Sequence, residues 1–328
     1  MPQESRGFFE ALIDDGRPLI SLTGLCLALS GAFALFQSAT GHFLPHDTEF
    51  LRMSSQDLCS INECRIVHFM FHDRVSFGGS LIAIAVLYLW MAAFPLKAGE
   101  AWAWSALCVS GIVGFGSFLT YLGYGYLDTW HGAATLALLP CFMAGMWMSR
   151  RLVLAKAAST GADTSWRSLL RANAETPWRS SAGMGRLCLL MAAVGMIGAG
   201  FTIQGIGMTR VFVPTDLTFM GIDSAQLDSI NPRLIPLIAH DRAGFGGGVA
   251  TAGLLLLACV WCAEPSRSLW QALLCGGIAG WSTAIGIHPL IGYTDAGHLA
   301  PAIAGALLFF VGLALCRSSM YRETHEVD

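Results

Sequence analysis

Eight long apolar stretches constrain this chain more than any other feature of its sequence. They cover residues 18–38, 75–95, 103–122, 130–149, 187–206, 243–262, 269–290 and 298–316. A helix needs about 20 apolar residues to cross the hydrocarbon core of a bilayer, and only 12% of the 328 residues are charged, against roughly 25% in soluble domains. The sequence therefore predicts an all-α integral membrane protein with eight transmembrane helices. The first stretch is too long for the core of a signal peptide, so we expect it to remain as a helix.

Positive charges predict the orientation in the membrane. Residues 150–186, between the fourth and fifth stretches, are rich in Arg and contain only Asp163 and Glu175 as acidic residues. The positive-inside rule places this region, and with it both termini, in the cytoplasm. We expect a multi-pass protein of the bacterial plasma membrane, surrounded by the lipid bilayer and capable of forming a homo-oligomer. The net charge of −3 gives no support for nucleic acid as a partner.

The two halves of the chain share four short motifs in the same order. The matching segments are PHDTEF with PTDLTF, LCSIN with LDSIN, FHDRVSFGG with AHDRAGFGG, and GYLDTWHGA with GYTDAGHLA. This predicts an N-terminal repeat over residues 1–149, a cytoplasmic linker over 150–186 and a C-terminal repeat over 187–328. Each repeat should be a four-helix bundle. Because an even number of spans separates the copies, a pseudo-two-fold axis along the membrane normal should relate them.

Four histidines fall at matched depths in these repeats. His72 and His240 precede the apolar cores of the second and sixth stretches, and His131 and His298 open the fourth and eighth. All four should lie near the outer face, with one facing pair in each repeat. A haem with two imidazole ligands needs such a pair, and helical bundles build metal sites from facing helices. We therefore expect His72 with His131, and His240 with His298, to be metal ligands.

The residues around these histidines suit a flat macrocycle. Glycines allow a close approach to a helix, arginines can pair with propionates, and an acidic residue three positions before a histidine shares its helical face. The residues expected in these roles are Gly78, Gly79, Gly246 and Gly247 as a flat wall, Arg74 and Arg242 as propionate partners, and Asp128 and Asp295 as partners that orient an imidazole or pair with an arginine.

Four features of the sequence together resemble those of a known protein family. They are the eight spans in two halves, a histidine at the outer end of each even-numbered span, His-x-Arg at 72–74 and 240–242, and the run GSFLTYLGYGYLDTWHGAA at 116–134. The family that they resemble is haem A synthase. The resemblance implies that His240 and His298 hold a haem b cofactor, and that His72 and His131 face a second haem as substrate. Where the family has a glutamate before the first histidine, this chain has Phe69. The catalytic carboxylate would then be Asp73 or Asp128.

A cysteine pair in the first outer loop fits the same family layout. Cys59 and Cys64 have Asp228 and Arg233 at the corresponding places of the second half, so only the first half can form this disulfide. Disulfides persist in the oxidising compartment outside the membrane. In the family such a pair marks the half that acts on the substrate.

Three functions remain open from the sequence. The first is a haem-dependent membrane oxidoreductase of the haem A synthase type, with one or two haem b groups. The second is a b-type cytochrome that relays electrons from a quinol to an outer electron-transfer partner. The third is a transporter whose duplicated Asp-His-Arg clusters bind an anion or a proton. A site with four histidines would also accept a chlorin.

Overall fold

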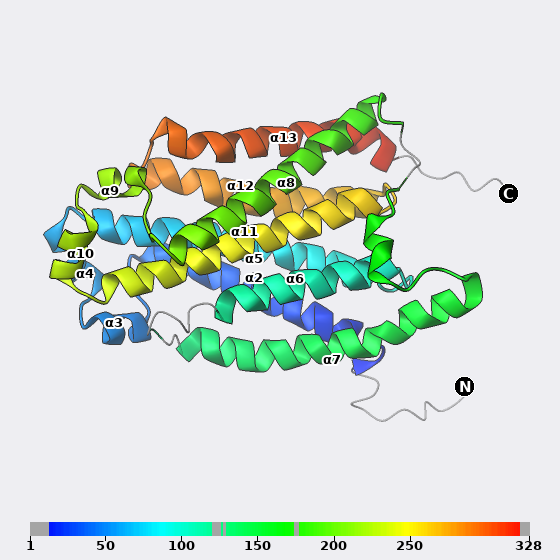
Figure 1. The fold of residues 1–328 in the computed structure, drawn as a ribbon, viewed down its shortest axis with the longest axis horizontal. Helices are drawn as coiled ribbons and strands as arrows, with labels where there is room; N and C mark the ends of the chain where they lie inside the picture. The colour runs from blue at the N-terminus through cyan, green and yellow to red at the C-terminus, as the bar shows by residue number, and fades with distance from the viewer. Residues whose placement is uncertain (1–12, 120–125, 127–128, 174–176, 322–328) are drawn as a thin grey trace.

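The computed structural model describes residues 13–119, 126, 129–173 and 177–321, and every regular element within them is a helix. Eight of these helices are long and apolar enough to cross a membrane, as predicted, and they run side by side along the long axis of the molecule (Figure 1). Their bounds are α2 (Arg17–Thr40), α5 (Arg65–Ala93), α6 (Ala101–Leu119), α7 (Thr129–Thr160), α8 (Ser181–Gly207), α11 (Leu234–Cys262), α12 (Arg267–Ile291) and α13 (Ala296–Met320).

Several helix boundaries differ from the predicted ones. Helix α5 begins at Arg65 rather than at residue 75, and α11 begins at Leu234 rather than at residue 243. Both His-Asp-Arg motifs therefore lie inside long helices and not in front of them. Their polar side chains are compatible with a helix because they are buried and paired with one another, as described below. The predicted linker is also partly helical, since α7 continues to Thr160 and a short 3-10 helix follows at Trp166–Leu170.

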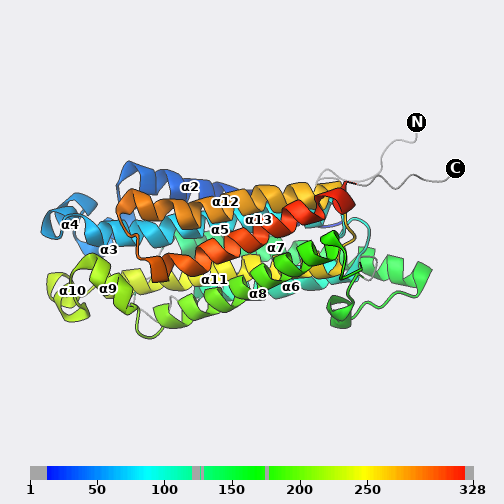
Figure 2. The same ribbon diagram turned by 90° about the horizontal axis from the view of Figure 1, so that it is seen from above.

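Helices α5 and α11 form the centre of the molecule. About 70% of the apolar window of each is buried, against 44% or less in the other six long helices. The two central helices pack against each other, and each has neighbours from both halves of the sequence. Helix α5 packs against α2 and α12, while α11 packs against α8 and α6; the two views in Figures 1 and 2 agree with these contacts.

This packing differs from the two separate four-helix bundles that the sequence predicted. Helix α12, from the second half, packs mainly against α5 of the first half, and α6 of the first half packs mainly against α11 of the second. The third long helix of each half has thus crossed to the central helix of the other half. The side chains of α5 and α11 are apolar or small around most of the circumference of each helix. Each helix can therefore bury this surface only if other helices pack against it on every side.

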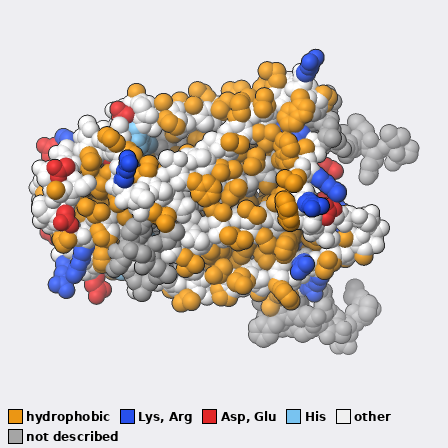
Figure 3. Space-filling model, in the orientation of Figure 1, with side chains coloured by type: hydrophobic (Ala, Val, Ile, Leu, Met, Phe, Trp, Pro, Cys, Tyr) orange, Lys and Arg blue, Asp and Glu red, His pale blue; other side chains and the backbone are white. Residues whose placement is uncertain are grey.

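Four short helices cap one end of the molecule, the end opposite to the first residues of α2 and the last residues of α13 (Figure 1). They are α3 (Pro45–Leu51), α4 (Ser55–Ile61), α9 (Pro214–Met220) and α10 (Ser224–Ile230). We call them the cap. Apolar side chains cover the middle of the surface, whereas most Lys, Arg, Asp and Glu side chains lie at the two ends (Figure 3). This distribution suits a protein whose middle is surrounded by lipid.

The two asparagines of the Ser-Ile-Asn motifs join the halves of the cap. The Asn62 side chain donates to the carbonyl of Met220 at 2.6 Å, and the Asn231 side chain donates to the carbonyl of Leu51 at 2.7 Å. Each asparagine therefore satisfies the last carbonyls of a short helix that belongs to the other half. This explains why the motif occurs in both halves.

Replacing Asn231 with alanine should lower the free energy of unfolding by about 1–3 kcal/mol, because it leaves the buried carbonyl of Leu51 without this donor. Thermal unfolding in detergent would measure the change. Ser60→Ala, on the exposed side of α4, is the matched control and should stay within about 0.5 kcal/mol. Equal effects of the two substitutions would contradict this role of Asn231.

Candidate metal centre

The outer Pro-x-Asp segments begin two helices of the cap. Pro45 and Pro214 stand in the first turns of α3 and α9, where a missing backbone N–H costs no hydrogen bond. Asp47 and Asp216 follow in the same turns and are only 1% and 0% exposed. The prolines thus start the helices that hold two carboxylates beneath the cap, next to α5 and α11.

Arg242, on α11, joins two of these buried carboxylates. Its Nη1 forms an ion pair with Asp216 and also donates to the carbonyl of Val211 at 2.7 Å. Its Nε donates to Asp73 of α5 at 3.3 Å, and the guanidinium lies 4.9 Å from the ring centre of Phe69. One arginine therefore connects the cap to both central helices.

Arg74, on α5, forms the equivalent ion pairs, with one aspartate of the cap and one aspartate of the second half. Its Nη1 lies 2.9 Å from Asp47 of the cap, and its Nε donates to Asp241 of α11 at 2.8 Å. The guanidinium also lies 5.7 Å from the ring centre of Phe43. The aspartate of each His-Asp-Arg motif is therefore bound by the arginine of the other motif.

The imidazole of His72 is held between a carboxylate and a second imidazole. Its Nδ1 lies 2.8 Å from the carboxylate of Asp73, and its Nε2 lies 3.1 Å from Nε2 of His288 on α12. Both histidines are buried, at 3% exposed each. Because the carboxylate accepts the Nδ1 proton of His72, the Nε2 of this residue presents its lone pair.

The turn between α12 and α13 brings a third imidazole to the same place. Gly292, with a φ of 79°, ends α12 in the left-handed conformation that favours glycine, and Asp295 caps α13 by accepting the backbone N–H of His298 at 2.7 Å. The hydroxyl of Tyr293, in this turn, donates to Asp216 at 2.9 Å and lies 3.1 Å from Nδ1 of His298.

The tyrosine determines which nitrogen of His298 is free. Burial and the charge of Asp216 raise the pKa of Tyr293, so its single proton stays in place and is given to that carboxylate. The phenol oxygen then accepts the Nδ1 proton of His298, which leaves the Nε2 lone pair of this imidazole available.

The three imidazoles converge on one point. One ring nitrogen from each of His72, His288 and His298 lies within 4.8 Å of the other two. The ring centres of His72 and His288 are 4.6 Å apart, and those of His72 and His298 are 5.5 Å apart. We call these three residues the histidine cluster.

The histidine cluster lies at one end of a large cavity. The cavity is lined by α5, α8, α11, α12 and α13 and has a volume of about 850 Å³, which is within the range of pockets that bind small organic molecules. Its lining includes Arg242 at the polar end, while residues such as Leu87, Leu256 and Phe309 make the rest of the wall apolar. The cavity can therefore hold a mainly apolar molecule whose polar end contacts the imidazoles.

The surroundings of His240 are different. Its Nδ1 lies 3.1 Å from Asp241, as in the His72 motif, and its ring meets the edge of Tyr126 with centres 5.2 Å apart. The cavities next to α11 on this side, however, have volumes of only 20–30 Å³, because Phe77 and Phe118 fill the space. The cavity beside the histidine cluster is therefore much larger than these two cavities.

The expected pairing of histidines within each repeat differs from the structure. His298, of the second half, lies beside His72 of the first half, with ring centres 5.5 Å apart. The cause is the crossing of α12 to α5, which brings the α12–α13 turn above α5. Asp128 and the side chain of His131 lie outside the described residues, so the expected pair of His72 with His131 stays a prediction.

The predicted flat wall of glycines is covered by neighbouring helices. A Cβ atom on Gly78 would meet α2, one on Gly79 would meet Thr283 of α12, one on Gly246 would meet α8, and one on Gly247 would meet Ser117 of α6. None of the four lines the large cavity. These glycines therefore allow close helix packing, which is a frequent role of small residues in membrane helices, and they do not offer a surface to a macrocycle.

The predicted propionate partners are also engaged within the protein. Arg74 and Arg242 each bind two carboxylates of the chain, as described above. Asp295 binds the backbone of His298 and not its imidazole, so Tyr293 is the residue that orients this ring. Asp73 lies at hydrogen-bonding distance from His72, as its position in the motif allows.

The sequence reasoning missed His288 and Tyr293. Tyr293 had a signal, because the Gly-Tyr pair before the aspartate occurs in both halves. His288 is not repeated in this way, because the residue at the corresponding position of the first half is Tyr121. The repeated Pro-x-Asp segments were noticed without a role, and their role is to supply buried partners for the arginines.

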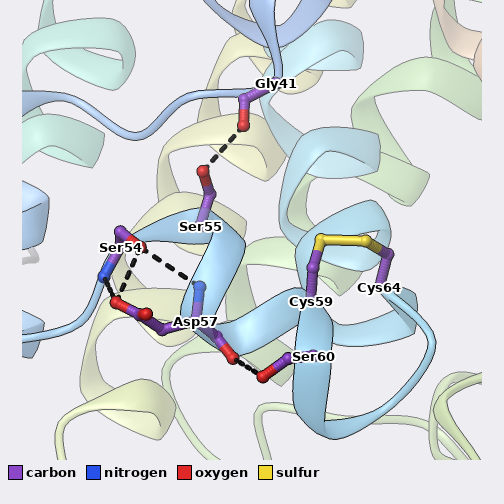
Figure 4. Close-up of a disulfide and its surroundings, with 7 residues drawn as sticks. All are labelled: Gly41, Ser54, Ser55, Asp57, Cys59, Ser60 and Cys64. Carbon is purple, nitrogen blue, oxygen red and sulfur yellow. Dashed lines mark hydrogen bonds between the residues drawn. A yellow bond between two sulfur atoms is a disulfide. The ribbon is translucent and has the colours of Figure 1, made fainter.

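The predicted disulfide between Cys59 and Cys64 is present. It connects α4 to Cys64, the N-cap residue of α5, next to the capping box of Ser54 and Asp57 (Figure 4). The hydrogen bonds from Ser54 hold the pKa of Asp57 below its usual value. The bridge thus fastens one helix of the cap to the helix that carries His72.

Comparison of the sequence with protein-family models and with curated proteins, and of the structure with solved structures, finds no match.

Proposed function

We propose that this chain is an integral membrane oxidoreductase whose redox group is a metal held by the histidine cluster. The observation that carries the proposal is the convergence of three imidazoles within 4.8 Å at the polar end of an 850 Å³ cavity with mainly apolar walls. Imidazole is a good ligand for iron, copper and zinc. A metal in this place would act on an apolar molecule held in the cavity, away from water.

Haem is the metal group that the resemblance to haem A synthase suggests, and it would supply one-electron and oxygen chemistry. A haem with two axial imidazoles fits this arrangement poorly. It needs ligands on opposite faces of a macrocycle, whereas Nε2 of His72 and Nε2 of His288 are 3.1 Å apart and the expected glycine wall is covered. The proposal therefore includes a haem with a single histidine ligand. This ligand would be His72, oriented by Asp73, or His298, oriented by Tyr293.

The reciprocal contacts between the halves support the proposed tandem repeat and its pseudo-two-fold axis along the membrane normal. Asn62 and Asn231 cap helices of the opposite halves, and Arg74 and Arg242 bind aspartates of the opposite motifs. We further propose that the chain lies in the bacterial plasma membrane with the cap outside and both termini in the cytoplasm. The arginine-rich segment 150–186 and its position at the far end from the cap support this orientation (Figure 1).

The other two functions receive less support from the geometry. A transporter that binds an anion at its Asp-His-Arg clusters needs available guanidinium groups, but Arg74 and Arg242 are each shared by two carboxylates. An electron relay from a quinol is compatible with the cavity, where a quinol would be the apolar molecule. It is a special case of the proposed oxidoreductase.

The test of the proposal is the metal content and the ultraviolet-visible spectrum of the purified chain in detergent. We expect about one iron or copper atom per chain, or one haem with a Soret band. A preparation without metal or haem, even after both have been supplied to the cells, would overturn the proposed function.

Filling the cavity should remove activity toward an apolar substrate without removing the metal. Gly195, on α8, lines the cavity and has open space around its Cβ position, whereas Gly198, one turn further on α8, also has open space but does not line it. We expect Gly195→Phe to lower quinol oxidation, or the affinity for a quinone analogue, at least about tenfold, because the phenyl ring would occupy cavity space that the ligand needs. Gly198→Phe is the matched control, and an equal loss in both variants would contradict a role of the cavity.

A further inference from the structure

We infer that the histidine cluster binds a single divalent transition-metal ion directly, without a macrocycle, and that His288 is its third ligand. The inference depends on the proposed function and specifies its metal. Imidazole nitrogens favour zinc, copper, iron and nickel over magnesium and calcium. The residues that carry the argument are His72, His288 and His298, with their partners Asp73 and Tyr293.

The distances suit a common ion. Two imidazole nitrogens that are each about 2.0–2.1 Å from a tetrahedral metal are roughly 3.3 Å apart. The Nε2 atoms of His72 and His288 are already 3.1 Å apart, and all three ligand nitrogens lie within 4.8 Å of one another. The 3.1 Å between His72 and His288 is close to the spacing of two ligands on one ion.

The hydrogen-bond partners expose the correct nitrogens. Metal-bound histidines usually donate their other ring N–H to a carboxylate or another acceptor, which fixes the tautomer and the ring orientation. The Nδ1 of His72 has the carboxylate of Asp73 at 2.8 Å, and Nδ1 of His298 has the phenol oxygen of Tyr293 at 3.1 Å. Both residues therefore direct an Nε2 lone pair to the centre of the cluster before any metal binds.

The local charge favours a cation. Asp73 and Asp216 are both buried, and Arg242 is the guanidinium that pairs with both of them. Two buried carboxylates therefore share one guanidinium next to His72. Buried excess charge is costly unless a counter-charge lies nearby, so a divalent ion at the three imidazoles lowers the cost.

Three helices supply the ligands, and this leaves one side of the ion open. His72 comes from α5, His288 from α12 and His298 from α13, and all three line the large cavity. A metal with three protein ligands and an open position is the arrangement of catalytic and not of structural metal sites. The open position would face the molecule held in the cavity.

The test uses Co²⁺ as the probe, on the full-length chain in detergent after treatment with a chelator. Elemental analysis and visible absorption should give one Co²⁺ per chain, displaced by Zn²⁺. His288→Ala should weaken Co²⁺ binding by more than about tenfold, because even the outer partners of metal ligands contribute 10–100-fold. His288→Cys, which supplies a different ligand atom, should restore much of the binding, and His42→Ala, at an exposed position outside the cluster, should bind like the unchanged chain.

The outcomes separate this inference from the proposed function. One haem per chain, retained with an unchanged Soret band in His288→Ala, would overturn the inference and leave the proposed oxidoreductase intact. Binding of Co²⁺ to His288→Ala as tight as to the unchanged chain would overturn the role of His288. A chain that takes up neither Co²⁺ nor haem would overturn both proposals.

Discussion

Replacing His72 with alanine should abolish metal binding in the large cavity, whereas the same replacement of His240 should leave it intact. Both residues occupy the same place in a His-Asp-Arg motif, and both have Nδ1 near the carboxylate of the next residue. They differ in what lies on the other side. His72 is in contact with His288 and near His298 at the large cavity, whereas His240 is not among the residues that line this cavity.

The measurement is the metal or haem content of the two variants after purification under identical conditions. We expect binding to fall by more than about tenfold in His72→Ala, since a lost ligand costs at least as much as a lost outer partner. Elution volume in size-exclusion chromatography should stay the same for both variants. Equal loss in His72→Ala and His240→Ala would show that the two motifs are equivalent and would contradict a single site.

Replacing Arg242 with methionine should lower the free energy of unfolding by about 3–5 kcal/mol, which is the usual cost of removing one partner from a buried ion pair. Arg242 is 5% exposed and binds Asp73, Asp216 and the carbonyl of Val211. Without it, two buried carboxylates lose the guanidinium that they share, and α9 of the cap loses its ion pair to α11. Of the substitutions discussed, we expect this one to have the largest effect on stability.

Thermal or denaturant unfolding in detergent would measure this effect. Arg210→Met, at an exposed position near the end of α8, is the matched control and should change stability by less than about 0.5 kcal/mol. Adding Asp73→Asn and Asp216→Asn to Arg242→Met should recover part of the loss, because these changes remove the uncompensated charges. A change of less than about 1 kcal/mol in Arg242→Met would show that the ion pairs are not essential to the fold.

The fold class followed from local features of the sequence. Eight apolar stretches gave eight helices long enough to cross a bilayer, and the predicted disulfide between Cys59 and Cys64 is present. Helices α5 and α11 begin about ten residues before the apolar stretches from which they were predicted, because these stretches leave out the polar His-Asp-Arg motifs. In the structure these groups are buried and satisfied by one another, so the helix continues through them.

The candidate site was only partly predictable. The positions of His72 and His298 along their helices predicted that both lie at the same depth in the membrane. Because their depths match, the two rings can lie next to each other in the structure. Their partners depend on which helices are neighbours, and hydropathy carries no information on that. Glycine is equally suitable for a cofactor surface and for close helix packing, so Gly79 and Gly246 were assigned to the wrong one of these two roles.

The sequence by itself determined that the chain forms eight membrane-length helices, that its two halves carry the same polar motifs, and that histidines recur at one depth. These properties depend on apolar length and on spacing along a helix, which are local. Only the tertiary structure decided that α12 crosses to α5, that arginines bind aspartates of the opposite half, and that His288 joins His72 and His298. The physical reason is that α5 and α11 must bury almost their whole circumference, and the helices that cover them come from both halves of the chain.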